Sequence, residues 1–391
     1  MKKSVLALTI AATTMGLFTG SADACSRISI DTGEHGVLQV RTLDWDSPLG
    51  TVAVVHPAGE KDRVNVTDGR YKNNAQWTTK YTTVAFEEHT FFHKAIPSGR
   101  NVHGLMVDTL YQSSSAPFVE KNVEMDEGKV TVGPGQIATY LPENYKTTDE
   151  VRQAFKKGEF DIAWGQQLVA VAHQHGFHTS VIDASGDALL FQLGEDGKTV
   201  MYSGDLAKPE FAVMANEPLL SESLEYASQF GAVTDLDFMN KVPAGIRSLD
   251  RFTRLMGMTA LHTPESYKGK SFMQAVGSLN GAFDHAANLA QFVPAGKAPK
   301  VMQEQDELLA KHHVGWNEAG VYPSRIKYTH ALENGFVEMV DLDTYRQISF
   351  NMNDVKGFTK PMCADMAAQA NDGKHVLEFK ECGAEIVELG K

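Results

Sequence analysis

The chain has 391 residues, of which 42% are hydrophobic and 22% charged, and its formal net charge is −13. This composition is typical of a soluble globular protein that buries a sizeable core and does not need disulfides or metal ions to stabilise it. The negative charge disfavours nucleic acid and an anionic membrane surface as partners, while the length allows one large domain or two ordinary ones.

The first 24 residues have the three-part pattern of a secretory signal. A short basic head precedes residues 4–19, which are mostly apolar or small, and Ala22 and Ala24 occupy the positions that a signal peptidase reads. The apolar part is too short for an ordinary transmembrane helix, so the alternative is a buried N-terminal helix. We expect residues 1–24 to be a signal peptide, and the mature protein to begin at Cys25, to be secreted to the periplasm and to have no membrane span.

The mature chain is expected to begin with a β-hairpin. Residues 25–30 alternate in polarity, residues 31–36 are rich in turn formers, and residues 37–45 resume the strand pattern. If the turn centres on Gly33, residues equally far from it pair across the hairpin, and Cys25 faces Arg41.

Such a pairing sets a guanidinium beside the thiol of Cys25 and favours the thiolate. Asp44 lies just beyond and can hold Arg41 or the α-amine of Cys25. An ordinary surface ion pair is the alternative interpretation of these two charges.

Further along the chain, strands dominate both ends and helices cluster in the middle. Thr147 and Glu150 have capping-box spacing before a helix at residues 149–157, and Gly158 ends it. The other expected strands are residues 51–56, 78–86, 104–111, 179–182, 188–193, 210–214, 327–330, 336–341 and 347–350, and the other helices are 164–173, 251–257 and 271–287. This order favours one layered α+β domain over residues 25–391.

The chain has three cysteines, an odd number for an exported protein. Cys363 and Cys382 lie close together in the sequence, and an oxidising compartment allows them to pair. Cys25 is then the remaining free thiol.

Signal cleavage before Cys25 would leave a thiol and a free α-amine on one residue. Their ordinary pKa values are about 8.5 and about 7.7–8.0, so near neutral pH the amine can take the thiol proton directly or through water. The residue then supplies nucleophile and base together. The alternative from another class is a lipid-anchored periplasmic binding protein with Cys25 as its anchor, although Ala22 and Asp23 depart from the lipoprotein pattern.

No metal or cofactor is expected. His173, His175 and His178 form a small cluster, but neither a cysteine pair nor a His-Glu-x-x-His motif supplies further ligands. Phosphate-loop, dinucleotide-binding and Gly-x-Ser-x-Gly motifs are likewise absent from the sequence.

Two short blocks carry a resemblance to a known family. Residues 25–27 (Cys-Ser-Arg) and 41–45 (Arg-Thr-Leu-Asp-Trp) resemble the start of the choloylglycine hydrolase family, which contains penicillin V acylases and conjugated bile salt hydrolases and belongs to the N-terminal nucleophile hydrolases. Weaker likeness continues at residues 101–111, 178–193, 215–218 and 248–252. The resemblance, closest to the Gram-negative type, implies a four-layer αββα sandwich and a homotetramer.

The resemblance also implies roles for particular residues. It makes Cys25 the nucleophile, positioned by Arg41 and Asp44 and supported by Arg251, with the oxyanion held by the Asn216 side chain and the backbone N–H of Tyr111. Taken alone, Asn216 is also a turn residue before a proline, and Arg251 is also an ordinary helix-surface arginine. The family often has an aromatic–Asp pair where this chain has Leu219 and Leu220.

The implied reaction is hydrolysis of a linear secondary amide through an acyl-thioester. Tyr111 stands where the bile-salt branch usually has asparagine, which favours penicillin V as the substrate. N-acyl-homoserine lactones and conjugated bile salts are the alternatives, since each joins an apolar acyl group to a polar amine. Trp45 either lines the acyl pocket, as aromatic residues do in similar Gram-negative acylases, or packs in the core.

Overall fold

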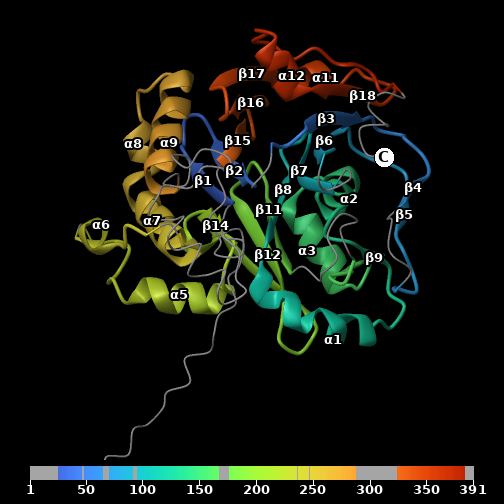
Figure 1. Ribbon diagram of the computed structural model, residues 1–391, viewed down its shortest axis with the longest axis horizontal. Coiled ribbons are helices and arrows are strands. Elements are labelled where there is room, and N and C mark those ends of the chain that lie inside the picture. The colour runs from blue at the N-terminus through green and yellow to red at the C-terminus, as the bar shows by residue number, and fades with distance from the viewer. Residues whose placement is uncertain are drawn as a thin grey trace, which may run out of the picture.

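A computed structural model of the chain, shown in Figure 1, describes residues 25–45, 48–64, 70–90, 95–166, 176–235, 237–245, 247–287 and 324–383. The expected signal peptide lies outside the described residues, as does most of the helix expected at residues 164–173. Within the described ranges, no helix combines the length and the apolar character needed to cross a membrane.

Two antiparallel sheets form the middle of the molecule, with helices on their outer faces (Figure 1). The six-stranded sheet has the order β14 (Val213–Ala215), β1 (Ser26–Asp31), β2 (Val37–Asp44), β15 (Ser324–Ala331), β16 (Phe336–Asp341) and β17 (Arg346–Asn351). The nine-stranded sheet has the order β13 (Thr199–Asp205), β12 (Asp187–Leu193), β11 (Phe177–Ile182), β8 (Met106–Tyr111), β7 (Ala95–Asn101), β6 (Thr83–Glu88), β3 (Thr51–His56), β18 (Met362–Asp365) and β19 (Lys380–Glu381). The architecture is the expected αββα sandwich.

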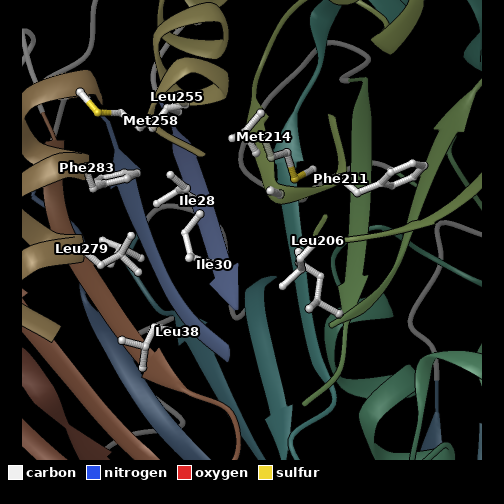
Figure 2. Close-up of a cluster of buried hydrophobic side chains, with 14 of the residues drawn as sticks. Ile28, Ile30, Leu38, Leu206, Phe211, Met214, Leu255, Met258, Leu279 and Phe283 are labelled. Atoms are coloured by element: carbon white, nitrogen blue, oxygen red, sulfur yellow. The ribbon is translucent and has the colours of Figure 1, made fainter. Parts of the chain in front are cut away.

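The outer face of the six-stranded sheet packs on helices α7 (Ser248–Leu261) and α9 (Phe272–Ala287). Figure 2 shows Ile28 and Ile30 of β1 pointing at these helices. The two side chains share a face because every second residue of a strand lies on the same side of the sheet. Burying each such side chain contributes about 1.5–3 kcal/mol. The alternating polarity of residues 25–30 therefore places the apolar side chains of β1 on the face that packs against the helices.

The inner face of the same sheet carries buried polar side chains on β2. Arg41 of β2 is completely buried, and its Nη1 lies 2.9 Å from Asp108 Oδ1 of β8, in the opposite sheet. Gln39 Nε2 donates to the other Asp108 oxygen at 2.8 Å. A buried charge must be paired, so these bonds fix how the two sheets face each other.

The register of the β1–β2 hairpin differs from the prediction. Arg27, not Cys25, pairs with Arg41, because the loop closes between Thr32 and Gly36. Gly33 and Gly36 both have a positive φ, +69° and +66°, which glycine adopts most readily, and the pairing of Asp31 with Val37 centres the hairpin one residue later than Gly33. The residue opposite Arg41 is thus two positions further along β1 than predicted. Because residues two apart on a strand share a face of the sheet, Arg41 stays on the same face as Cys25.

The outer face of the nine-stranded sheet is covered by α2 (Ile137–Asn144), which packs on β7 and β8. This contact is so close that a Cβ on Gly99 would lie 1.8 Å from Ala138 O. Helix α3 (Thr148–Lys156) follows, and its N-cap Thr147 accepts a hydrogen bond from Glu150 N at 3.2 Å, as the spacing predicted.

Most other expected elements are present, with shifted ends. The strand expected at residues 210–214 is wrong in its first half, because Pro209 begins a short helix, α4 (Pro209–Ala212), before β14. The remaining elements are β4 (Arg63–Val64), β5 (Gln76–Trp77), β9 (Thr131–Val132), β10 (Asp161–Ile162), the 3-10 helix η1 (Ser113–Phe118), α1 (Val119–Glu124), α5 (Leu220–Ser228), α6 (Phe238–Lys241), α8 (Pro264–Tyr267), α11 (Met352–Val355) and α12 (Met366–Asn371).

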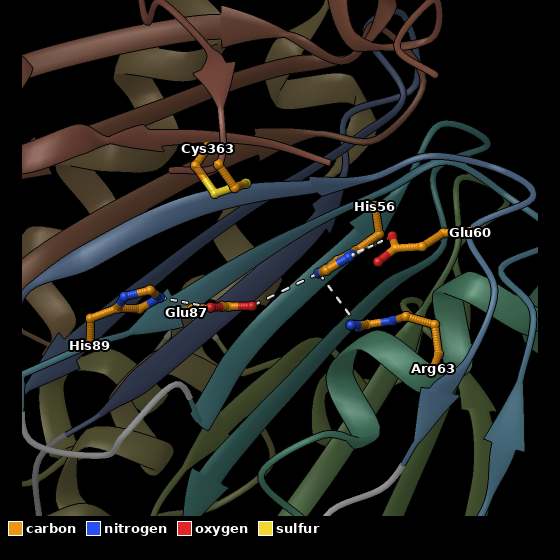
Figure 3. Close-up of a disulfide and its surroundings, with 7 residues drawn as sticks. His56, Glu60, Arg63, Glu87, His89 and Cys363 are labelled. Carbon is orange, nitrogen blue, oxygen red and sulfur yellow. Dashed lines mark hydrogen bonds and ion pairs between the residues drawn. A yellow bond between two sulfur atoms is a disulfide. The ribbon is translucent and has the colours of Figure 1, made fainter. Parts of the chain in front are cut away.

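A disulfide joins Cys363 of β18 to Cys382, directly after β19 (Figure 3). Cys25, at the start of the described chain, is a free thiol.

Candidate active site

A cavity opens between the two sheets, with Cys25 in its wall. Its lining is largely apolar and comes from both sheets and nearby loops: Leu43, Trp45, Leu49, Ile96, Pro97, Leu110, Tyr111, Pro134 and Phe177. Among the described residues, it brings the only free cysteine into contact with space for an apolar group.

The cavity lies where β7 and β8 stop pairing. Their last ladder pair is Ser98 with Asp108, and the next residue of β7, Pro97, has no N–H to continue the ladder. The Arg41 guanidinium donates to Pro97 O at 2.7 Å and lies 3.5 Å from Thr109 O. Arg41 thus satisfies the carbonyls at the point where the strands separate.

The thiol of Cys25 lies among charges of both signs. Burial and the nearby Asp44 carboxylate raise its pKa, while Arg41, the backbone of Asp44 and Arg251 lower it. The balance is a raised pKa, so the thiol is protonated near neutral pH. A base must therefore remove its proton before it can act as a nucleophile.

Asp44, the last residue of β2, is a buried carboxylate beside Cys25. Burial raises its pKa to about 6, against the lowering effects of Arg251 and of hydrogen bonds from Ser324 and Thr42. It is therefore mostly ionised at pH 7. An anion at this position stabilises positive charge on the neighbouring residue.

Arg251 lies in the first turn of α7 and binds the start of β1. Its Nη1 donates to Cys25 O at 2.8 Å and to Ser26 Oγ, and its Nη2 donates to Asn216 Oδ1 at 3.3 Å. The residue is 2% exposed, so it is not the helix-surface arginine that its sequence alone also allowed.

Asn216 lies beside Cys25 because β14 pairs with β1. The last pair is Ser26 with Ala215, so the next positions, Cys25 and Asn216, are adjacent. Asn216 Nδ2 donates to Tyr111 O at 3.2 Å. An amide nitrogen carries two hydrogens, so the same group is able to donate a second hydrogen bond.

The backbone N–H of Tyr111 points toward the same region. Gln112 N donates to Gly176 O across the β8–β11 edge. Because successive N–H groups of a strand alternate in direction, that of Tyr111 points to the opposite edge, past the end of the β7 ladder.

Aromatic rings form one wall of the cavity. Trp45 and Tyr111 are stacked with centroids 5.9 Å apart and planes at 24°, and Phe177 lies 4.8 Å from Tyr111. Trp45 lies in the pocket wall and also packs against the hydrophobic core between the sheets.

Two residues of this region are not apparent from the sequence. Asp108, the partner of Arg41, is a lone carboxylate in an otherwise apolar strand, and that contrast is a signal for a buried ion pair. Glu217 follows Asn216 and gives no signal of its own.

Of the histidine cluster noted in the sequence, His178 is a core residue whose pKa is lowered to about 3 by burial and by Arg27. His173 and His175 lie outside the described residues.

Comparison with known proteins identifies the family of the chain. The sequence model of the family described as linear amide C–N hydrolases, choloylglycine hydrolase family, matches residues 25–277. A search of curated proteins found no match.

Solved structures share the fold. Penicillin V acylase from Agrobacterium tumefaciens aligns with a TM-score of 0.66 and 19% identity over 92% of this chain and 100% of that chain. A variant of conjugated bile acid hydrolase from Clostridium perfringens aligns with a TM-score of 0.62 and 13% identity over 92% of this chain and 97% of that chain.

Proposed function

Because this chain belongs to the choloylglycine hydrolase family of linear amide C–N hydrolases, we propose that it cleaves N-acyl amides through an acyl-thioester on Cys25. The observation that carries the proposal is the position of the free thiol in the wall of an apolar cavity, next to Arg251, Asp44 and Asn216. The family makes the chain a hydrolase of linear amides, and the residue roles below are our proposal.

In the proposed mechanism, removal of residues 1–24 frees the α-amine of Cys25. The amine takes the thiol proton, and the thiolate attacks the amide carbon. The resulting oxyanion accepts hydrogen bonds from Asn216 Nδ2 and the Tyr111 N–H, each worth on the order of 3 kcal/mol in the transition state. Asp44 stabilises the α-ammonium, which then gives its proton to the leaving nitrogen as the C–N bond breaks.

The second half of the reaction reverses the roles. The free amine product leaves and water enters, and the α-amine takes a proton from that water as its oxygen attacks the thioester carbon. The same two donors hold the second oxyanion. Cleavage of the C–S bond releases the carboxylic acid and returns the proton to the thiol, so the enzyme is regenerated.

For the substrate, we propose penicillin V. Its phenoxyacetyl group is flat and aromatic, and the rings of Trp45, Tyr111 and Phe177 line the apolar cavity beside Cys25, where they can pack against such a group. N-acyl-homoserine lactones and conjugated bile salts provide the comparison substrates, because their acyl groups lack an aromatic ring.

The test uses mature protein that begins at Cys25, assayed with all three amide classes. We expect the highest kcat/KM with the phenoxyacetyl amide and an acylated Cys25 in rapidly quenched samples analysed by mass spectrometry. Cys25→Ser should fold and be inactive, and a precursor that retains residues 1–24 should also be inactive because its Cys25 nitrogen is an amide. Near-normal turnover by either variant would refute the mechanism.

A separate measurement tests the alternative that the protein is a lipid-anchored binding protein and not an enzyme. The mass of the N-terminal peptide from exported protein distinguishes a free Cys25 amine from a diacylglyceryl cysteine. The free amine supports the enzyme, and the lipid supports an anchored binding protein.

A further inference from the structure

A buried carboxylate joins the two segments that carry the proposed oxyanion donors. Glu217 directly follows Asn216 and is 8% exposed. It accepts hydrogen bonds from the backbone N–H groups of Ser113 and Ser114, the latter at 2.9 Å. Such charge-assisted bonds are among the stronger ones in proteins, so Glu217 holds the chain shortly after Tyr111.

Two further hydrogen bonds run between the same segments. Asn216 Nδ2 donates to Tyr111 O at 3.2 Å, and Gln112 Nε2 donates to Pro218 O at 3.0 Å. The residues that follow β14 are therefore bonded to successive residues at the end of β8.

The backbone of Glu217 connects this junction to the third segment of the site. Its N–H donates to Ser248 Oγ at 2.7 Å. Ser248 is the first residue of α7, and one turn later Arg251 reaches Asn216 and Cys25. Glu217 thus contacts both the segment of Tyr111 and the helix that carries Arg251.

We infer that Glu217 is a positioning residue that keeps the Tyr111 N–H and the Asn216 amide at the separation a single oxyanion requires. The inference rests on the proposed function, in which these two groups receive the oxyanion. Oxyanion donors act only when they point at the position where charge develops, and a displacement of about 1 Å can cost about 100-fold in rate. Glu217 is not among the described residues that line the cavity, so it acts through the donors.

The experiment compares Glu217→Gln with Asp183→Asn in the mature full-length protein. Asp183 is a matched control, since its buried carboxylate accepts from Thr148 N and Ser185 N, both at 2.9 Å, and it too is not among the described lining residues of the cavity. Each change keeps the shape but turns one acceptor oxygen into an NH2 group that opposes the backbone donor. We measure kcat and KM with a phenoxyacetyl amide, alkylation of Cys25 by iodoacetamide, and hydrogen exchange over residues 111–116.

In Glu217→Gln we expect kcat to fall about 10- to 100-fold while KM stays within about twofold. Alkylation should keep its rate, because displacement at a saturated carbon forms no oxyanion. Exchange over residues 111–116 should become faster. Asp183→Asn should lower the melting temperature and leave kcat unchanged.

Wild-type kcat in Glu217→Gln, an equal loss of kcat and alkylation, or unchanged exchange over residues 111–116 would each overturn the inference. Failure of the proposed function has a different signature. A wild-type protein that cleaves none of the amides, or an active Cys25→Ser, refutes that function, while the exchange measurement still tests whether Glu217 holds the segment.

Discussion

At the scale of single residues, the reactivity of Cys25 depends on opposing charges within a buried site. Asp44 raises the pKa of its thiol, and Arg41 and Arg251 lower it. Arg41 is itself paired with Asp108, so the more direct comparison is between Asp44 and Arg251.

Asp44→Asn should lower the pKa of the Cys25 thiol, and Arg251→Gln should raise it. Removing a negative charge favours the thiolate, and removing a positive charge disfavours it. The measurement is the pH dependence of Cys25 alkylation in each folded variant. Despite the lower thiol pKa, Asp44→Asn should lose about 10- to 100-fold in kcat/KM, because the α-ammonium loses its anion. Shifts in the same direction in both variants would contradict the assigned electrostatics.

Substrate choice is expected to depend on the Tyr111 side chain, whose ring lies between Trp45 and Phe177. Tyr111→Asn removes the ring but keeps the backbone N–H, so catalysis should persist. We expect hydrolysis of a phenoxyacetyl amide to weaken several-fold more than that of a bile-salt amide, since one aromatic contact is worth about 0.5–1.5 kcal/mol. An equal drop in kcat/KM for both substrates would mean that the ring only supports the fold.

At the scale of elements, the C-terminal part of the chain is fastened to the nine-stranded sheet by short strands and one disulfide. Strands β18 and β19 share two ladder pairs, Met362 with Glu381 and Cys363 with Lys380. So few backbone bonds hold the end of the chain weakly, which gives the disulfide a larger part in keeping it there.

Replacing Cys363 and Cys382 together by serine should lower the melting temperature without affecting activity. Closing a loop of about 20 residues stabilises the fold by roughly 3 kcal/mol in the chain-entropy description. The measurements are thermal unfolding and kcat, with Cys25→Ser as the control that loses activity but keeps its melting temperature. An unchanged melting temperature in the double variant would show that the end of the chain unfolds independently of the sheets.

At the scale of the whole molecule, a chain of buried ionisable groups ties β3, β6 and the following loops together (Figure 3). His56 Nδ1 lies 2.9 Å from Glu60 Oε2, and Glu87 Oε2 lies 2.7 Å from His89 Nε2. Burial alone lowers the pKa of His56, but the hydrogen bond to Glu60 and the ion pair with Glu87, at 3.8 Å, outweigh it and raise the pKa to about 9. Burial alone raises the pKa of Glu87, but the ion pair with His56 and the hydrogen bond with His89 lower it to about 2.

These shifts predict a stability that declines on both sides of weakly acidic pH. The His56 contribution is complete below its unfolded pKa of about 6.5 and is lost as the pH rises to 9 and above. The Glu87 contribution is complete above about 4.5 and is lost as the pH falls toward 2. Denaturant unfolding at pH 6 and pH 9 should differ by about 2–3 kcal/mol from His56, and His56→Gln should reduce that difference. An identical pH dependence in this variant would show that other groups determine it.

The sequence by itself determined the elements whose signals are local. The alternation of β1, the capping box of α3 and the composition of the turn before β2 depend on neighbouring residues, and the structure contains all three. The resemblance of residues 25–27 and 41–45 to a hydrolase family also needs only local sequence, and the family match agrees with it.

The tertiary structure decided what depends on residues far apart in the chain. Asn216 meets Cys25 only because β14 adds to the edge of β1. The Arg41–Asp108 pair joins strands of the two sheets, and Glu217 links the residues after β14 to those after β8, so the partner of each group depends on tertiary packing. Local sequence limits backbone conformation, whereas the distance between two buried charges is set by how the sheets pack, and in this protein that packing positions the groups around Cys25.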